Sequence, residues 1–264
     1  MARNSGKVIH MSNKIRAIAV LLALAVAGVL SGCNAVPMAQ SRSWGGGASG
    51  KSGSMARFTI NSNYMYAVSD TSLFIFNLEK GARPALVSKM AIGWDIETIF
   101  SYKDLLFFGT RGGMIIYDIA KREQPLLVST YRHIRSDDPV VVQDGYAYVT
   151  LRSRNGRKEN NVLQVYDIKD PSTPILVKTY QMNNPWGLGI DGGKLFVCDG
   201  KHGLKVYDAT KASNLKLLET IEEINGYDVI PCGRSLIVSA RDGIYQFDYN
   251  EAKLKKLSRI PVGY

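Results

Sequence analysis

The sequence is poor in the residues that carry metal and nucleophilic chemistry. It contains three cysteines and three histidines in 264 residues. No segment reads G-x-S-x-G or H-E-x-x-H, and no cysteine–histidine cluster has zinc spacing, so the enzyme classes that depend on these motifs are excluded. His133 and His202 each stand alone in an expected loop. The sequence therefore predicts no catalytic residues, no metal site and no cofactor.

Long hydrophobic runs are also scarce, and the one that exists lies near the N-terminus. Residues 17–30 are apolar and come after the basic start MSNKIR at Met11, a second candidate for the true first residue. The run is shorter than the roughly 20 residues of a membrane span and has the layout of a secretory signal. We expect residues 1–32 to form this signal peptide.

The signal ends in the four residues LSGC, Leu30 to Cys33, which resemble the lipobox of bacterial lipoproteins. The resemblance implies cleavage after Gly32 and acylation of Cys33, with palmitate among the acyl chains, and hence a membrane anchor. Asn34 stands where an Asp would mark inner-membrane retention, so the resemblance implies the outer membrane. The alternatives are an ordinary signal peptide and an uncleaved anchor.

The segment after Cys33 has the composition of a linker. Residues 35–54 are rich in Gly and Ser, so we expect residues 33–54 to carry the lipid and act as a flexible tether. The net charge of +10 includes four basic residues in the signal peptide. The remaining basic character fits anionic lipid or polymer as well as an ordinary solubilising surface, and an exported protein gives no reason to expect nucleic acid. Cys198 and Cys232 are expected to be free and buried.

A repeat fills residues 55–264. The segments MIIYDIAKREQPLLV and LQVYDIKDPSTPILV have counterparts before and after them, and the first apolar run of each ends in one acidic or amide residue: Asn77, Asp118, Asp167, Asp208 and Asp248. Successive members are 41, 49, 41 and 40 residues apart. A period near 40 that holds several short strands is typical of propeller blades.

Each repeat also has two upstream strands joined by a tight turn, such as Asp144-Gly145. The sequence therefore predicts an all-β fold: a β-propeller of five four-stranded antiparallel blades. The recurring Asp is expected to accept backbone amide hydrogen bonds in its turn rather than to do chemistry. LQVYDIKDPSTPILV resembles the LVIVD repeat, and the first, fourth and fifth copies are degraded. The resemblance implies an exported bacterial or archaeal β-propeller and implies little about activity.

Propeller topology places several candidate binding residues on one rim. Loops between blades, and loops between second and third strands, share this rim. The main candidates are Trp94, Asp138, Trp186, Tyr227, Asp228, Arg152, Arg154, Arg157 and Lys158, the last four in a long loop predicted to be a basic finger. Asp95, Glu97, Arg111, Asp137, Lys201, His202, Arg241 and Asp242 share the rim. Inter-blade packing is the alternative role of Trp94 and Trp186.

Three functions fit this pattern. The favoured hypothesis is a lipid-anchored envelope module that binds or scaffolds a protein or an anionic envelope polymer. A propeller hydrolase or lactonase would hold a cation in the central channel with carboxylates such as Asp95, Asp138 and Asp228. A purely structural envelope component would use none of these residues.

Ring closure can also be predicted. No strand is left over at either end, so the first and last blades should meet through side chains alone. We expect Ile60, Tyr64 and Tyr66 to pack against Ile237, Tyr245 and Phe247 across that junction.

Overall fold

The computed structural model describes residues 53–79, 83–132, 139–153 and 161–262. These residues form strands, turns and loops. Within them, no helix is long and apolar enough to cross a membrane. The predicted signal peptide, Cys33 and most of the tether lie outside the described residues. So do Asp137, Asp138, Arg154, Arg157 and Lys158.

Within the described ranges, twenty strands form five sheets. Blade 1 consists of β1 (Phe58–Asn61), β2 (Tyr64–Val68), β3 (Ser72–Asn77) and β4 (Ala85–Ala91). Blade 2 consists of β5 (Ile96–Tyr102), β6 (Leu105–Thr110), β7 (Gly113–Asp118) and β8 (Leu126–Arg132). Blade 3 consists of β9 (Val140–Gln143), β10 (Tyr146–Leu151), β11 (Val162–Asp167) and β12 (Ile175–Gln181). Blade 4 consists of β13 (Leu188–Asp191), β14 (Lys194–Cys198), β15 (Leu204–Asp208) and β16 (Lys216–Ile221). Blade 5 consists of β17 (Gly226–Cys232), β18 (Ser235–Ala240), β19 (Gly243–Asp248) and β20 (Lys255–Pro261).

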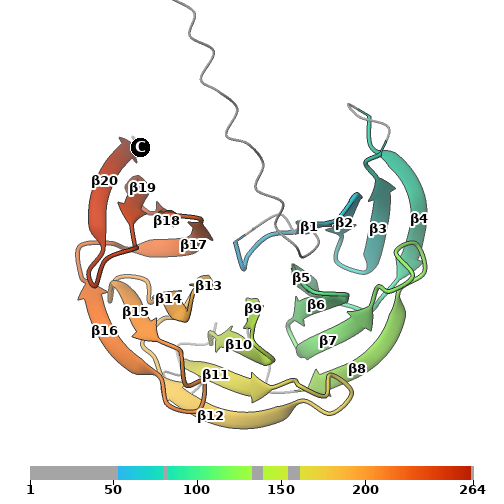
Figure 1. Cartoon of the computed structure of the whole chain (residues 1–264), viewed down its shortest axis with the longest axis horizontal. Coiled ribbons are helices and arrows are strands. Elements are labelled where there is room, and N and C mark those ends of the chain that lie inside the picture. The colour runs from blue at the N-terminus through green and yellow to red at the C-terminus, as the bar shows by residue number, and fades with distance from the viewer. Residues whose placement is uncertain (1–52, 80–82, 133–138, 154–160, 263–264) are drawn as a thin grey trace, which may run out of the picture. The chain divides into compact units, whose positions relative to one another are not determined.

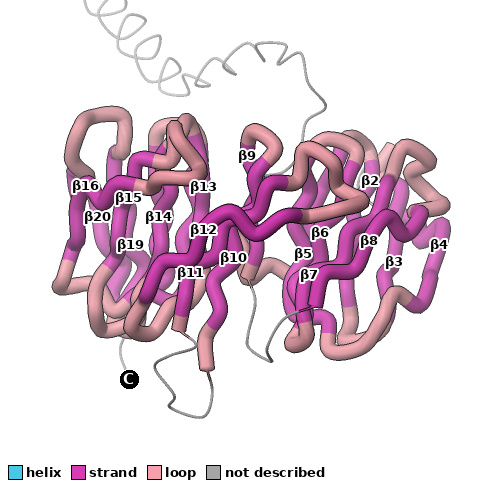
Figure 2. The backbone as a smooth tube through the Cα atoms, turned by 90° about the horizontal axis from the view of Figure 1, so that it is seen from below, coloured by secondary structure: helices cyan, strands magenta, loops and turns pink. Residues whose placement is uncertain are grey.

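The predicted five-bladed propeller is confirmed. In each blade the four strands pair in sequence order and every pair is antiparallel. Figure 1 shows the five blades arranged around a centre, with the first strand of each blade innermost and the fourth outermost. Figure 2 shows the same blades from the side, with the connecting loops gathered along two opposite rims.

The turns have the chemistry that the repeat predicts. Asp118 accepts the amide of Ala120 at 2.6 Å, and Asp167 accepts that of Lys169 at 3.0 Å. Asn77, Asp208 and Asp248 make the same bond to the residue two positions on. The recurring side chain is therefore a structural turn residue in all five blades, as predicted.

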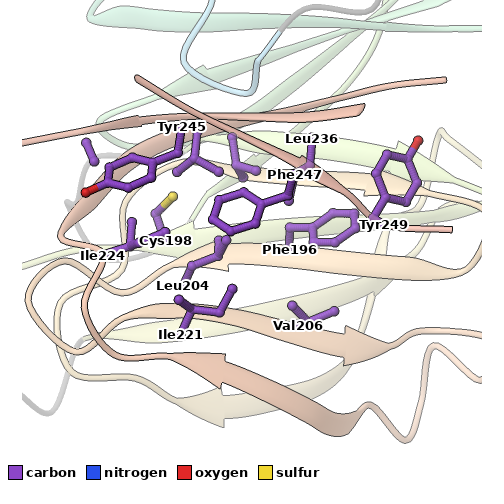
Figure 3. Close-up of a cluster of buried hydrophobic side chains, with 13 residues drawn as sticks. Phe196, Cys198, Leu204, Val206, Ile221, Ile224, Leu236, Tyr245, Phe247 and Tyr249 are labelled. Atoms are coloured by element: carbon purple, nitrogen blue, oxygen red, sulfur yellow. The ribbon is translucent and has the colours of Figure 1, made fainter. Parts of the chain in front are cut away.

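Four hydrophobic clusters hold neighbouring blades together. Each cluster joins one pair: blades 1 and 2, 2 and 3, 3 and 4, or 4 and 5. Figure 3 shows the cluster between blades 4 and 5, where Phe196 and Leu204 meet Tyr245 and Phe247. Among the described residues, no such cluster joins blade 5 to blade 1.

This arrangement corrects the predicted junction. Tyr66 is fully buried, but it packs in the cluster between blades 1 and 2 and donates its hydroxyl to the Arg122 carbonyl at 3.0 Å. Tyr64 packs against the same cluster, while Tyr245 and Phe247 face blade 4. Strand alternation explains the error: the side chains sit on the opposite face of their sheets from the one assigned. The prediction that each blade is built from consecutive strands is correct.

A short segment before β1 connects the blades that the clusters leave apart. The Ala56 carbonyl accepts the Ile99 amide of blade 2 at 3.0 Å. The buried Ser54 hydroxyl accepts the Leu188 amide of blade 4 at 2.7 Å and donates to Asp228 of blade 5 at 3.3 Å. Residues 53–56, which we call the closing segment, therefore tie the first blade to the last two near the centre of the ring.

The two described cysteines differ in exposure. Both are free thiols, as expected. Cys198 is buried in the cluster between blades 4 and 5, whereas Cys232 is exposed, contrary to expectation. Cys232 ends β17 beside the turn at Gly233, and this turn projects beyond the sheet.

Candidate functional site

The predicted rim is formed by loops that hydrogen-bond to one another. The Arg111 amide, after β6, donates to the Asp95 carbonyl of the preceding inter-blade loop at 3.2 Å. The same bond recurs in blade 5, from the Arg241 amide to the Asn225 carbonyl at 3.0 Å. These bonds place both kinds of loop at one end of the strands. We call this end the inter-blade rim and the opposite end the turn rim.

A stacked aromatic group stands on the inter-blade rim between blades 3, 4 and 5. The Arg152 guanidinium lies over the Trp186 ring, 3.6 Å from its centroid. On blade 5, the Tyr227 ring meets Trp186 edge to face with centroids 5.2 Å apart. Trp186 also packs on the core cluster of blades 4 and 5, which confirms the inter-blade packing role considered from the sequence. We call Arg152, Trp186 and Tyr227 the stacked triad.

Hydrogen bonds fix the backbone of Trp186 from two blades. Its amide donates to the Cys198 carbonyl at 2.7 Å, and its carbonyl accepts the Thr150 hydroxyl at 2.6 Å. The backbone of Trp186 is therefore held in place by contacts within the protein.

A buried carboxylate organises the loop that carries Trp186. Asp199 is fully buried and accepts the amides of Asn183 and Asn184 at 3.1 and 2.7 Å, and it pairs with Lys205 at 2.6 Å. Sequence reasoning missed this residue, although Asp199-Gly200 is a turn signal directly after an apolar strand. Its role is to position the tryptophan loop.

Asp228 follows Tyr227 in β17, and its carboxylate contacts the closing segment. Its carboxylate accepts the Ser54 hydroxyl, and burial raises its pKa to about 6 despite hydrogen bonds from Ser54, Met55 and Val229. Gly53 and Gly187 flank it, and a Cβ at either position would overlap the carboxylate oxygens. The carboxylate is thus enclosed by the closing segment and by the start of blade 4.

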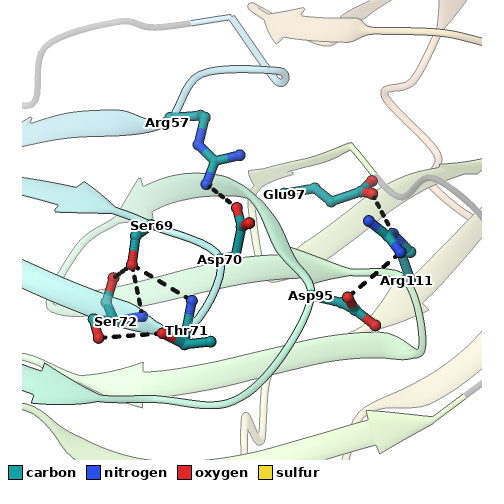
Figure 4. A network of polar contacts seen from close by, with 8 residues as sticks. All are labelled: Arg57, Ser69, Asp70, Thr71, Ser72, Asp95, Glu97 and Arg111. Atoms are coloured by element: carbon teal, nitrogen blue, oxygen red, sulfur yellow. Dashed lines mark hydrogen bonds and ion pairs between the residues drawn. The ribbon is translucent and has the colours of Figure 1, made fainter.

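The part of the rim on blades 1 and 2 carries ion pairs. Arg111 pairs with Glu97 at 3.1 Å and with Asp95 at 3.5 Å, while Arg57 pairs with Asp70 at 2.8 Å. Figure 4 shows these pairs beside the serine-rich turn at Ser69. Exposed ion pairs of this kind stabilise a fold by about 1 kcal/mol or less. In this structure the carboxylates of Asp95 and Glu97 therefore serve as ion-pair partners of Arg111.

The remaining candidates are spread around the rim. Trp94 is 81% exposed, so it is not an inter-blade packing residue. Lys201 and His202 are exposed in the loop between β14 and β15, and Asp242 pairs with Arg259 at 2.6 Å. Among residues 53–79, 83–132, 139–153 and 161–262, no three His, Cys, Asp or Glu side chains lie close enough together to hold a metal ion.

Two clefts open on the turn rim instead. One, of about 390 Å³, lies between blades 3 and 4 beside Tyr146 and Gly193. The other, of about 490 Å³, lies between blades 2 and 3 beside Tyr102 and Lys169. Neither is lined by a residue that the sequence selected for binding.

Comparison with known proteins supports the repeat and the fold. Residues 135–182 match the family model of the LVIVD repeat, so the chain carries this repeat where the sequence resemblance was strongest. A comparison with curated proteins finds no match.

Solved structures resemble the chain in fold alone. A functionally unknown protein from Desulfotomaculum acetoxidans DSM 771 has a TM-score of 0.62 at 12% identity, over 82% of this chain and 70% of that one. The periplasmic gluconolactonase PpgL of Pseudomonas aeruginosa has a TM-score of 0.57 at 15% identity, over 78% of this chain and 68% of that one. A chain of the mitotic checkpoint complex has a TM-score of 0.58 at 14% identity, over 76% of this chain and 64% of that one.

Proposed function

We propose that this protein is a non-catalytic binding module of the bacterial cell envelope, and that it holds a protein or an anionic envelope polymer at the stacked triad. The observation that carries the proposal is the triad itself, in which the Arg152 guanidinium lies over the Trp186 ring and the Tyr227 ring meets Trp186 edge to face. Trp, Tyr and Arg are the residues most enriched among the energetic centres of protein interfaces.

Preorganisation supports the same function. A partner that binds Trp186 does not have to order its loop, because Thr150, Cys198 and Asp199 already fix it. Binding to a rigid group avoids part of the entropy cost of association.

Basic residues in and around the rim loops fit an anionic partner, beside the exposed acids Glu222 and Glu223 of the loop between blades 4 and 5. Lys201 and His202 are exposed on the adjacent loop of blade 4, and the chain segment after Arg152 contributes Arg154, Arg157 and Lys158 in sequence. Solved propellers of similar fold occur in a mitotic checkpoint complex and in a nidogen–laminin complex. These likenesses support a binding role for the fold without naming a partner for this chain.

The binding test is capture of partners by crosslinking in intact cells. Arg152→Glu reverses the charge over Trp186, and Trp186→Phe keeps an aromatic ring in the core cluster but loses the indole. We expect each to lower partner capture about tenfold, the effect of losing roughly 1.4 kcal/mol at an interface. Trp94→Ala is the matched control, because Trp94 is a tryptophan of the same rim, 81% exposed, in the loop between blades 1 and 2. Equal loss in all three variants would contradict the proposal.

The envelope location is a separate part of the proposal and has its own test. We propose that acylated Cys33 anchors the domain to the outer membrane through the tether. Cys33→Ser should release the protein from membranes after a high-salt wash. Persistent membrane fractionation of that variant would show that the anchor lies elsewhere.

A lactone hydrolase is the second candidate, and Asp228 is the observation in its favour. A carboxyl group with a pKa near 6 in the centre of a propeller suits general acid–base catalysis. The same carboxylate, however, is occupied by Ser54 and by backbone amides. Lactone turnover by the purified protein that disappears in Asp228→Asn would establish this function in place of the binding role.

A further inference from the structure

The face of blade 1 that does not pack on blade 2 is apolar. Residues paired across neighbouring strands lie on the same side of a sheet. Two rows of such pairs cross this face: Phe58, Ala67 and Phe74 in one, and Ile60, Met65 and Phe76 in the other. Phe58 is 52% exposed, and the other five side chains are partly exposed. We call these six residues the open face.

The same register is buried in the other four blades. The strand pairs align the blades, since Tyr64 pairs with Asn77 as Leu105 pairs with Asp118. The counterparts of Met65, Ala67 and Phe76 in blades 2 to 5 are Leu106, Phe108 and Tyr117, then Ala147, Val149 and Tyr166, then Leu195, Val197 and Tyr207, then Leu236, Val238 and Phe247. Each is at most 8% exposed and packs on the preceding blade. The open face therefore has the side chains of a packed face, and no described residue of another blade buries it.

Blade 5 does not present the surface that would cover the open face. In the other interfaces the preceding blade supplies one buried aromatic residue at the same register: Tyr66, Phe107, Tyr148 or Phe196. Blade 5 has Ile237 at this position and the polar Gln246 beside it, where blades 1 to 4 have an aliphatic residue.

Hydrogen bonds keep the far face of blade 5 polar. The Gln246 carboxamide donates to the Ser235 hydroxyl at 3.0 Å and accepts the Ser258 hydroxyl at 3.1 Å. A polar outer face is what a terminal repeat needs in water. Blade 5 has this adaptation, whereas the open face of blade 1 lacks it and also lacks the aromatic residue that the other interfaces receive.

The tether joins the domain at this same junction. A Cβ on Gly53 would overlap the Asp228 carboxylate and would lie 3.1 Å from Cγ1 of Ile230 in β17. Ile230 pairs with Ile237, so it lies on the face of blade 5 that does not pack on blade 4. Gly53 therefore lies between blade 5 and β1, and the open face lines the junction into which the preceding residues lead.

The sequence of the tether supplies an aromatic residue at a suitable distance. Residues 45–52 are Gly, Ala, Ser and one Lys, and Trp44 comes directly before them. A flexible linker of nine residues spans roughly 17 Å on average. Four strands at the usual spacing cover about 15 Å, so Trp44 can reach any part of the open face. A covalently linked side chain also has a local concentration in the millimolar range.

We propose that Trp44 of the tether docks on the open face of blade 1. Its indole covers Met65, Phe74 and Phe76 and takes the place of the aromatic residue that a preceding blade supplies elsewhere in the ring. If Cys33 carries the anchor proposed above, docking leaves only residues 34–43 as the free span between the lipid and the domain. The propeller is then held closer to the membrane than an extended tether would hold it.

Fluorescence quenching of the full-length chain in mild detergent tests the docking. Trp94→Phe with Trp186→Phe leaves Trp44 as the only tryptophan. Trp44→Phe with Trp186→Phe leaves Trp94, which is 81% exposed, as the reference. Quenching by acrylamide should be several-fold weaker for Trp44 than for Trp94, because a docked indole is shielded from water.

Variants of the two faces assign the shielding. In the chain that retains only Trp44, Met65→Ser with Phe74→Ser should raise the quenching to the level of Trp94. The matched control is Ile237→Ser with Ile244→Ser on the far face of blade 5, which should leave Trp44 shielded. Shielding that survives Met65→Ser with Phe74→Ser would show that detergent, rather than the open face, covers Trp44.

Disulfide trapping tests the contact without removing apolar side chains from several positions at once. Cys232→Ser removes the exposed thiol, while Cys198 is buried. In that background, Trp44→Cys with Met65→Cys should form a disulfide within one chain several-fold more completely than Trp44→Cys with Ile244→Cys.

Three results would overturn the proposal. One is quenching of Trp44 as strong as that of Trp94. Another is equal trapping at residues 65 and 244, since the tether would then pass through the junction without docking. The third is a disulfide between two chains in place of one within a chain, because a second copy would then be the occupant of the open face.

Discussion

The interface between blades 1 and 2 and the junction between blades 5 and 1 are built from the same repeat, yet they differ in kind. The first buries Tyr66, Leu73 and Ile75 against the next blade. At the second, Phe58 and Ile244 remain 52% and 42% exposed, and no buried cluster of described residues spans the two blades. The repeat gives each blade two apolar faces. Where the first and last blades do not cover each other's outer face, interactions other than apolar packing must hold them together.

In this protein that connection is polar and local. The closing segment reaches blades 2, 4 and 5 through backbone and hydroxyl hydrogen bonds rather than through apolar area. A typical hydrogen bond contributes about 1 kcal/mol, whereas a buried aromatic side chain contributes several times as much. The junction should therefore be the weakest contact in the ring.

The largest effect is expected from truncating an aromatic residue in a filled interface. Tyr66→Ala should lower the free energy of unfolding by about 3–5 kcal/mol, because it leaves a cavity and removes the partner of the Arg122 carbonyl. Phe58→Ala, on the face of blade 1 that no cluster covers, should lower it by less than about 1 kcal/mol.

Denaturant unfolding of the two variants measures this difference. A similar loss in both would mean that the first and last blades are packed together in solution. The contrast between the two interfaces would then be wrong.

A pH-dependent effect of intermediate size is expected at the junction. Asp228 has a raised pKa of about 6 in the folded protein against 3.8 for an unperturbed Asp. The folded state then binds the proton more tightly than the unfolded state, so stability should rise as the pH falls from about 6 to about 4. The shift corresponds to about 3 kcal/mol at most.

Asp228→Asn should remove this rise, as measured by chemical unfolding across that pH range. The turn carboxylates Asp167, Asp208 and Asp248 have lowered pKa values, so the stability that they contribute is lost only at lower pH. If the stability of Asp228→Asn still rises as the pH falls, a group other than Asp228 causes the rise.

The smallest effect is expected from the closing segment itself. Ser54→Ala leaves the buried Leu188 amide without its acceptor, which should cost about 1–2 kcal/mol. Hydrogen exchange of residues 56–68 should become faster, since the segment that holds blade 1 is released.

Ser172→Ala is the matched control, because it also removes a serine hydroxyl that bonds to an Asp, but at an exposed turn. Unchanged exchange in Ser54→Ala would show that blade 1 is held by other contacts.

Much of the fold was predictable because it depends on local chemistry. The spacing of Asn77, Asp118, Asp167, Asp208 and Asp248 predicted five blades, and each residue caps its turn as expected. Turn signals such as Asp144-Gly145 identified the strand pairs, since positive φ at Asp144 and Gly145 closes a two-residue turn. The order of strands predicted the inter-blade rim and the placement of Trp186 and Tyr227 on it.

Other features were not predictable because they depend on which face of a sheet meets which neighbour. Strand alternation gives two faces but does not say which blade each face contacts, and this is why Tyr66 and Tyr245 were assigned to the wrong junction. The sequence around Ser54 and Asp199 does not indicate that these side chains are buried. Their roles depend on contacts with residues far away in the chain, up to 174 positions in the case of Ser54 and Asp228.

By itself the sequence determined the number of blades, the strand pairs, the turn residues and the rim on which the candidate site lies, because these depend on contacts within one repeat. Only the tertiary structure decided that Arg152 and Tyr227 meet Trp186, that Asp228 is enclosed by the closing segment, and that no buried cluster of the described residues joins the last blade to the first. Those outcomes depend on contacts between repeats, where the separation of residues along the chain no longer indicates their separation in space.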